Sequence, residues 1–183
     1  MLQIDGSEKS GSGTILRNAV ALSTLFGEDV RISRIRAKRD KPGLRPQHLA
    51  AVKAVAEMCG ARVEGARVGS SELVFRPGDR INGGEYRWDI GTAGSTTMVA
   101  LAVLPVALFA SSDTSFVLSG GVFQDFAPSP YHMQRVLLAT LGGMGIEAAV
   151  EVERPGYVPG GAGVIRLSVK PVKQSISALS LPE

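Results

Sequence analysis

The chain contains Gly11-Ser12-Gly13-Thr14 and, 83 positions later, Gly94-Ser95-Thr96-Thr97. Each tetrapeptide opens an apolar run with helical spacing, and the runs end at phenylalanines that are again 83 positions apart. A second matching pair, Pro46-Gln47-His48-Leu49 and Pro130-Tyr131-His132-Met133, is offset by 84 positions. This self-similarity predicts that one structural unit occurs twice in the chain.

Each unit is expected to hold two helices and about four short strands. In the first unit we predict helices at 14–26 and 46–59 and strands at 2–4, 30–35, 62–64 and 72–75. In the second unit we predict helices at 96–109 and 130–141 and strands at 116–118, 147–153 and 164–169. The chain then divides into a first repeat at 1–78, a second at 79–172 and a connecting segment at 173–183. Helices covering one face of each sheet give an α/β (α+β) fold.

Composition excludes several classes of protein. Of the 183 residues, 44% are hydrophobic and the net charge is only +3, which excludes general disorder. Aromatic residues make up 5%, which argues against an RNA-binding sheet built on stacked rings. Cys59 is the single cysteine, so an intramolecular disulfide and a multi-cysteine zinc site are excluded. The most apolar stretch, 98–110, is shorter than the roughly 20 residues a bilayer requires. We expect a soluble, cytoplasmic protein with no membrane partner.

The positive charge is concentrated in one segment. Between Val30 and Arg45 a single acid, Asp40, opposes seven basic residues: Arg31, Arg34, Arg36, Lys38, Arg39, Lys41 and Arg45. Such a cluster suits a polyanionic partner, namely nucleic acid, a nucleotide or a phosphorylated substrate. A solvated surface loop is an equally weighted alternative.

Two places in the first unit carry residues suited to phosphate chemistry. The Gly-Ser-Gly turn precedes a helix, whose unpaired backbone N–H groups and dipole favour an anion, and Arg17 follows one turn later. Arg36 and Arg39 lie in a predicted loop, and Gln47 and His48 lie on the first turn of the next helix. Guanidinium groups bind phosphate oxygens through two parallel hydrogen bonds. A tight turn, a packed arginine stem and a packed histidine are the structural alternatives.

One long motif resembles a known family. The segment Ile35-Arg-Ala-Lys-Arg39-Asp-Lys-Pro-Gly-Leu-Arg-Pro-Gln-His-Leu49 is similar to the signature of RNA 3′-terminal phosphate cyclases. Further segments resemble the family in the same order along the chain: Ile4-Asp-Gly, Gly13-Thr-Ile-Leu-Arg17, Ile90-Gly-Thr-Ala-Gly-Ser95, Ser119-Gly-Gly121, Ala127-Pro128, and Gly156-Tyr157 through Gly160-Gly161.

The resemblance implies a fold and the extent of the chain. The family's main domain has three repeats, each like the C-terminal domain of bacterial translation initiation factor 3, and a smaller domain is inserted after the second. This chain then corresponds to two of the three repeats. Because the apolar surface that a third repeat would cover stays exposed, we expect self-association or pairing with the missing C-terminal half.

The resemblance also implies a reaction. A histidine attacks the α-phosphorus of ATP with the help of a divalent metal (Mg or Mn), AMP passes to the 3′-phosphate of RNA, and the 2′-hydroxyl displaces it to leave a 2′,3′-cyclic phosphate. Arg17, Arg36 and Gln47 are then catalytic and Pro128 lines the nucleotide pocket. Binding of the substrate phosphate is assigned to four residues: Arg39, Lys41, Arg45 and His48.

Departures from the family pattern keep a second function open. Ser10 stands where an acid usually helps to hold metal, Leu101 where a glutamine contacts the nucleotide, and Val122-Phe123 where a Thr and an acid or amide are usual. The nucleophile belongs to the third repeat, so this chain alone is expected to be inactive. The alternatives are a non-catalytic, cyclase-like RNA-binding protein of ribosome assembly and, more distantly, a relative of the enolpyruvyl transferases.

Overall fold

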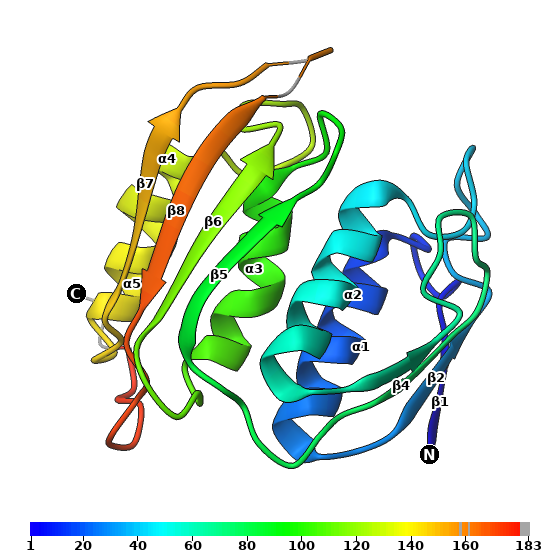
Figure 1. The fold of residues 1–183 in the computed structure, drawn as a ribbon, viewed down its shortest axis with the longest axis horizontal. Helices are drawn as coiled ribbons and strands as arrows, with labels where there is room; N and C mark the ends of the chain where they lie inside the picture. Colours follow the sequence, from blue (N-terminus) through cyan, green and yellow to red (C-terminus); the bar gives the residue numbers. More distant parts are fainter. Residues whose placement is uncertain (158, 161, 180–183) are drawn as a thin grey trace.

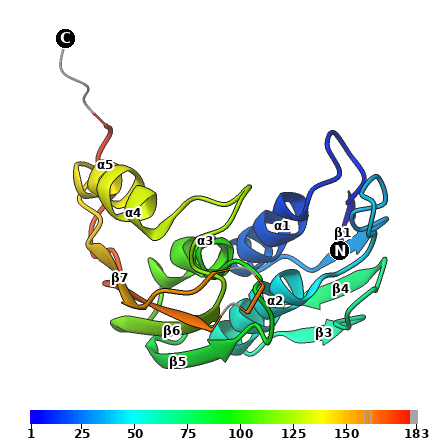
Figure 2. The ribbon, with the colours of Figure 1, turned by 90° about the horizontal axis from the view of Figure 1, so that it is seen from above.

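The computed structural model describes residues 1–157, 159–160 and 162–179. They form two four-stranded sheets with helices packed on them, so the chain is a mixed α/β protein (Figure 1). In Figure 2, helices α1, α3, α4 and α5 lie above strands β3, β5 and β6.

The first sheet has the order β1-β2-β4-β3. Its strands are β1 (Leu2–Asp5), β2 (Val30–Ser33), β4 (Leu73–Arg76) and β3 (Arg62–Glu64). β1 and β2 are parallel, and α1 (Gly13–Phe26) supplies the crossover that parallel neighbours require. The other pairs are antiparallel, and α2 (Pro46–Cys59) follows β2.

The second sheet has the order β5-β6-β8-β7. Its strands are β5 (Gly84–Asp89), β6 (Thr114–Gly120), β8 (Gly163–Val169) and β7 (Ala148–Arg154). Here α3 (Thr96–Ala107) crosses between the parallel strands β5 and β6. A helical segment follows β6 and consists of α4 (Pro130–His132), the π-helical turn η1 (Met133–Leu137) and α5 (Leu138–Gly142).

The strand order of the second sheet therefore matches that of the first, position by position. The likeness to translation initiation factor 3 and the domain limits at 78 and 172 stay predictions, and residues 180–183 of the proposed connection lie outside the described part.

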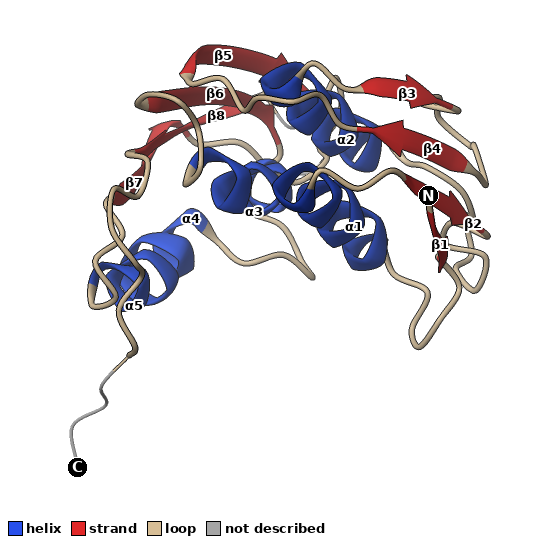
Figure 3. Cartoon of the chain, turned by 90° about the horizontal axis from the view of Figure 1, so that it is seen from below, coloured by secondary structure: helices blue, strands red, loops and turns tan. Residues whose placement is uncertain are grey.

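The alternation of buried and exposed residues along the strands shows where the hydrophobic core lies. Val30 and Ile32 of β2 are buried while Arg31 between them is exposed, and Phe116 and Leu118 of β6 are fully buried. Helices α1, α2 and α3 pack against one another in the middle of the molecule, and the segment from α4 to α5 packs on β7 (Figure 3).

The parallel strands bring four loops to one end of the molecule. Loops 6–12 and 34–45 follow β1 and β2, and loops 90–95 and 121–129 follow β5 and β6. These loops lie towards the upper edge of Figure 1, where α1, α2 and α3 begin. In α/β proteins the carboxyl ends of parallel strands are the usual place for a ligand.

Three differences between the predicted elements and the structure stand out. β2 ends at Ser33 rather than Ile35, because Arg34 and Arg36 adopt left-handed backbone conformations (φ 49° and 54°) that break the strand. β5 at 84–89 was not predicted, although its tyrosine and tryptophan alternate with charged residues. The predicted helix 130–141 contains the π-helical turn η1 in its middle.

No helix in the described part of the chain is both long and apolar enough to cross a bilayer.

Candidate functional site

The starts of α1, α2 and α3 form the centre of the candidate site. Ser12 caps α1 by accepting a hydrogen bond from the N–H of Thr14 at 3.3 Å, and Ser95 caps α3 by accepting from the N–H of Met98 at 3.2 Å. Pro46 occupies the first turn of α2, where a missing N–H does no harm. None of the three helices has an acid in its first turn. Their positive ends are therefore not neutralised locally.

Side-chain contacts fix these three helix starts to one another. The ring of His48 on α2 lies against Gly13 of α1 so closely that a Cβ there would meet Nε2 at 2.0 Å. The Oε1 atom of Gln47, also on α2, accepts a hydrogen bond from the N–H of Ser95 at 2.9 Å. Gln47 therefore links the two halves of the chain through the backbone N–H of Ser95 at the start of α3.

Arg17 is buried on α1, with 7% of its surface exposed. Its Nη2 atom lies 3.2 Å from the hydroxyl of Thr14 and 3.3 Å from the sulfur of Met98 on α3. Burial lowers the pKa of the Arg17 guanidinium, yet arginine remains protonated at neutral pH. A buried cation is costly unless an anion or strong hydrogen-bond acceptors compensate it.

Arg17, Arg36 and Arg45 surround His48, and Arg39 lies near Arg36; we call Arg17, Arg36, Arg39 and Arg45 the arginine cluster. Their charges act on the pKa values of His48 and Arg36. The pKa of His48 is lowered to about 3, first by burial and then by the charges of Arg36, Arg17 and Arg45. The pKa of Arg36 is lowered by burial and then by Arg39 and Arg45.

Ion pairing separates the arginine cluster from four other arginines. Outside it, the described ion pairs include Arg31 with Glu72, Arg34 with Asp5, Arg76 with Glu64, and Arg166 with Glu153. Within residues 1–157, 159–160 and 162–179, no member of the arginine cluster pairs with a carboxylate. These four cations thus have no acidic partner in the described part of the chain, and such an arrangement favours an anion.

Arg36 also organises loop 34–45, which we call the basic loop. Its Nη1 atom donates to the carbonyl of Gly43 at 3.0 Å and to the carbonyl of Lys41. The left-handed backbone of Arg36 costs roughly 1–3 kcal/mol for a residue with a Cβ, a kind of strain that is concentrated at functional sites. The side chains of Arg39 and Lys41 are exposed.

His48 is buried and neutral at physiological pH. Its Nδ1 atom accepts a hydrogen bond from the N–H of Arg45 at 3.2 Å, so the ring proton resides on Nε2, the nitrogen that faces Gly13. A neutral, packed ring helps to position α2. A direct bond from His48 to phosphate stays a prediction.

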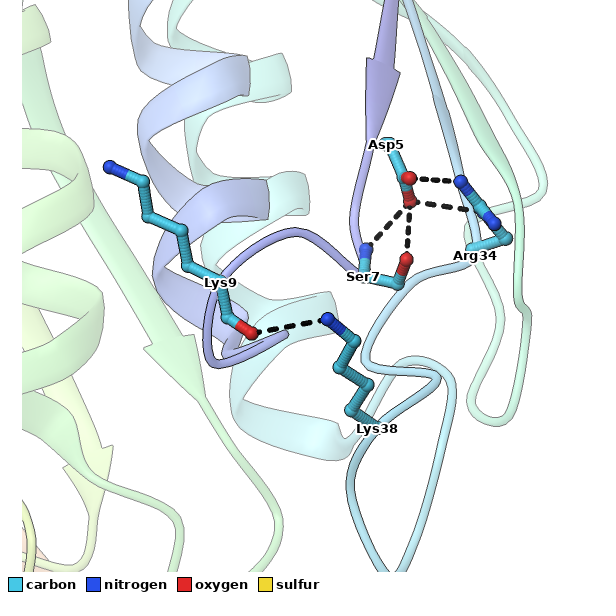
Figure 4. A network of polar contacts seen from close by, with 5 residues as sticks. All are labelled: Asp5, Ser7, Lys9, Arg34 and Lys38. Carbon is cyan, nitrogen blue, oxygen red and sulfur yellow. Dashed lines mark hydrogen bonds and ion pairs between the residues drawn. The ribbon is translucent and has the colours of Figure 1, made fainter.

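The loop after β1 is fastened to the basic loop (Figure 4). Oδ1 of Asp5 accepts hydrogen bonds from the N–H and hydroxyl of Ser7 at 2.9 and 2.7 Å and from Nε of Arg34 at 3.1 Å. The bonds from Ser7, together with Arg34, lower the pKa of the Asp5 carboxyl. Nζ of Lys38 reaches the carbonyl of Lys9 at 3.3 Å. These contacts hold the segment that leads into α1.

The structure brings Arg17, Arg36, Gln47 and His48 together at the helix starts, with Arg39 and Arg45 beside them. Pro128 lies in a different loop, between β6 and α4, and is half-buried there. The contacts of Ser95 and Met98 were not predicted; the capping position of Ser95 is visible in the sequence, whereas Met98 gives no local signal. A cavity of about 650 Å³ lies at the opposite ends of β5 and β6, lined by Gly84 and Thr114 among others, and is separate from this site.

The side chains of the site suit phosphate oxygens better than a metal ion. Arginines and helix starts suit phosphate oxygens. Among the described residues no three His, Cys, Asp or Glu side chains gather as a metal-binding group, and Glu8 and Ser10 are both exposed. The described side chains therefore offer no ready ligand set for a divalent metal.

Comparison with known proteins identifies the family. The sequence matches the family model described as RNA 3′-terminal phosphate cyclase over residues 8–180. The chain belongs to the RNA 3′-terminal phosphate cyclase family. Curated relatives bearing that name are 46% identical in Desulfurococcus amylolyticus, 47% in Archaeoglobus fulgidus and 48% in Nitrosospira multiformis.

These alignments cover 99%, 94% and 93% of this chain but only 50%, 52% and 48% of the relatives. The chain thus spans about half the length of the curated cyclases it matches. Among solved structures, the enolpyruvyl transferase NikO from Streptomyces tendae aligns with a TM-score of 0.43 and 16% identity, over 85% of this chain and 29% of that one.

Proposed function

We propose that the arginine cluster binds the phosphates of ATP and of an RNA 3′ end within a protein that converts an RNA 3′-phosphate to a 2′,3′-cyclic phosphate. The observation that carries this proposal is the arginine cluster itself, whose four cations have no carboxylate partner among the described residues. Family membership supports the same chemistry.

The geometry suggests what each residue contributes. Arg17 is held rigidly between α1 and α3, so its charge is in place before a phosphate arrives, which is how fixed cations stabilise charge that develops in phosphoryl transfer. Arg36 uses Nη1 to shape the basic loop, and its other donors can form a fork to phosphate oxygens. Gln47 positions the start of α3. Exposed Arg39 and Lys41, together with Arg45, follow the RNA strand.

Residues 1–183 alone are proposed to be inactive. His48 is buried, and its proton-bearing nitrogen faces Gly13, so it is poorly placed to attack ATP. His132 is exposed on α4 and lies outside the arginine cluster. The test is incubation of residues 1–183 with ATP and 3′-phosphorylated RNA, and formation of a cyclic phosphate by this chain alone would overturn the claim.

Phosphate recognition is tested by comparing oligoribonucleotides that end in a 3′-phosphate or a 3′-hydroxyl. Arg36→Ala should weaken binding of the phosphorylated oligonucleotide roughly tenfold or more, because a bond to a charged group is lost. It should also reduce the dependence of the affinity on salt. Arg31→Ala removes the same charge from an exposed residue that is paired with Glu72, and should change little. Equal effects of the two variants would contradict the proposal.

A second candidate is a non-catalytic RNA-binding protein of ribosome assembly. The observations that favour it are the exposed Ser10, where a metal-holding acid is usual in the family, and the half-buried Leu101 on α3, where a glutamine is usual. Binding of RNA with no binding of ATP by the whole protein would favour this candidate.

A further inference from the structure

Three aromatic rings form a stack on the loops of the second half. Phe123 lies between Tyr131 and Tyr157, with ring centroids 5.5 and 5.6 Å apart and interplanar angles of 33° and 25°. The guanidinium of Arg135 lies over the ring of Tyr131, 5.7 Å from its centroid. We call Phe123, Tyr131, Tyr157 and Arg135 the aromatic stack.

Exposure distinguishes the aromatic stack from core packing. Tyr131 is 51% exposed and Tyr157 is 62% exposed, whereas Phe123 between them is partly buried and supports both. The chain's other stack shows the contrast. There Phe116 is fully buried and stacks with both Tyr86 and Trp88, and Trp88 donates to Glu57 of α2 at 2.6 Å, so those rings join elements of the fold.

Backbone contacts hold the aromatic stack in place. The N–H groups of Val122 and Phe123 both donate to the carbonyl of Gly156, each at 3.2 Å, which fixes the loop after β6 against the segment that carries Tyr157. Phe123 and Tyr157 also form an isolated β-bridge. The two outer rings thus gain a rigid support without being covered.

The same loop is tied to the arginine cluster through the start of α3. The N–H of Gly121 donates to the carbonyl of Gly94 at 2.8 Å, and the carbonyl of Gly121 accepts from the N–H of Thr96 at 2.9 Å. The adjacent Ser95 is the residue whose N–H donates to Gln47. The aromatic stack and the arginine cluster therefore belong to one connected framework at the carboxyl ends of the parallel strands.

We propose that the aromatic stack binds unpaired bases of the RNA near its 3′ end, with Tyr157 offering the open ring face and Arg135 adding a guanidinium beside Tyr131. This inference rests on the proposed function, because it assumes that the arginine cluster holds the terminal phosphate. Exposed rings and guanidinium groups beside a cationic, phosphate-binding surface are the combination by which proteins bind single-stranded RNA. A stack of several rings suits successive bases of a strand better than the single base of ATP.

The test measures binding of a 3′-phosphorylated oligoribonucleotide to the whole protein by fluorescence anisotropy. Tyr157→Ala should weaken the affinity on the order of tenfold, the usual effect of losing one stacked base, and leave the salt dependence unchanged. Tyr157→Phe should retain the affinity, because it keeps the ring. Phe109→Ala, an exposed aromatic beyond the far end of α3, is the matched control and should have no effect. Circular dichroism checks that each variant is folded.

An oligonucleotide with abasic sites next to its 3′ end tests whether the lost affinity comes from bases at that end. Wild type should bind it at least as weakly as Tyr157→Ala binds the normal strand, and removal of the bases should cost Tyr157→Ala less affinity than it costs wild type. Loss of affinity in Arg36→Ala but not in Tyr157→Ala would overturn the stacking inference and leave the proposed function intact. If neither variant weakens RNA binding, both fail. If Tyr157→Ala weakens ATP binding and spares RNA, the rings serve the nucleotide instead and the inference is wrong.

Discussion

At the scale of single residues, Gly13 determines how closely α1 and α2 approach. A methyl group on this residue would meet the buried ring of His48, whose Nδ1 already holds the N–H of Arg45. Because the His48 ring is buried and hydrogen-bonded, overpacking should be destabilising at this position.

Gly13→Ala should therefore lower the free energy of unfolding by roughly 1–3 kcal/mol, measured by urea denaturation. Gly142→Ala is the matched control, since a Cβ on this exposed helical glycine meets nothing within 4 Å and stability should stay constant or rise. Adding His48→Ala to Gly13→Ala should remove the steric penalty. A Gly13→Ala protein as stable as wild type would show that the contact is looser than described.

His48 should make the stability of the fold depend on pH. Its pKa in the folded chain is about 3, below the ordinary value of 6.5, owing to burial and to Arg36, Arg17 and Arg45. Between those pH values the unfolded chain takes up a proton that the folded chain excludes, so stability falls as the pH drops below about 6.5.

From pH 7 to pH 5 this loss should be on the order of 1–2 kcal/mol. His48→Asn keeps an acceptor for the N–H of Arg45 and has no titrating ring, so its stability should fall less over the same range. Parallel pH profiles for the two proteins, measured by denaturant titration, would contradict a buried neutral His48.

At the scale of elements, the start of α3 depends on a side chain from α2. The N–H of Ser95 is buried and donates to Oε1 of Gln47, so no water replaces that acceptor easily. The side-chain oxygen of Gln47 thus links the start of α2, in the first half of the chain, to the start of α3, in the second half.

Gln47→Leu should cost roughly 1–3 kcal/mol of stability, because it leaves a buried donor without an acceptor. Gln47→Glu keeps an oxygen at this position and should retain most of the stability. Thermal unfolding of the two variants beside wild type measures the difference, and equal losses would mean that shape rather than the hydrogen bond matters.

At the scale of the whole molecule, several large apolar side chains on the helices are exposed. Leu22 and Phe26 on α1 and Val136 on η1 are each at least half exposed. Exposed apolar side chains on these helices suit a contact with another protein surface.

Residues 1–183 produced by themselves should therefore self-associate. Sedimentation velocity should show an average mass that rises with concentration, and Phe26→Lys combined with Val136→Lys should shift the protein towards monomer. The double variant Arg31→Glu and Glu72→Arg changes surface charge without removing apolar area and serves as the control. A compact monomer at all concentrations would refute this prediction.

Local sequence determined the elements to a large extent. Helix periodicity, the serine caps and the proline at the start of α2 are properties of neighbouring residues, and α2 and β3 were predicted with the bounds that the structure has. Family membership likewise followed from short motifs in order along the chain, and the family comparison confirmed it.

Tertiary structure alone decided which of the basic residues have an acidic partner. Seven basic residues crowd the segment from Val30 to Arg45, yet Arg31 and Arg34 are neutralised by Glu72 and Asp5, from distant parts of the chain. Arg36, Arg39 and Arg45 have no such partner among the described residues, and buried Arg17 joins them only because α1 packs on α2 and α3. Charge pairing and burial depend on neighbours in space, which no local pattern in the sequence specifies.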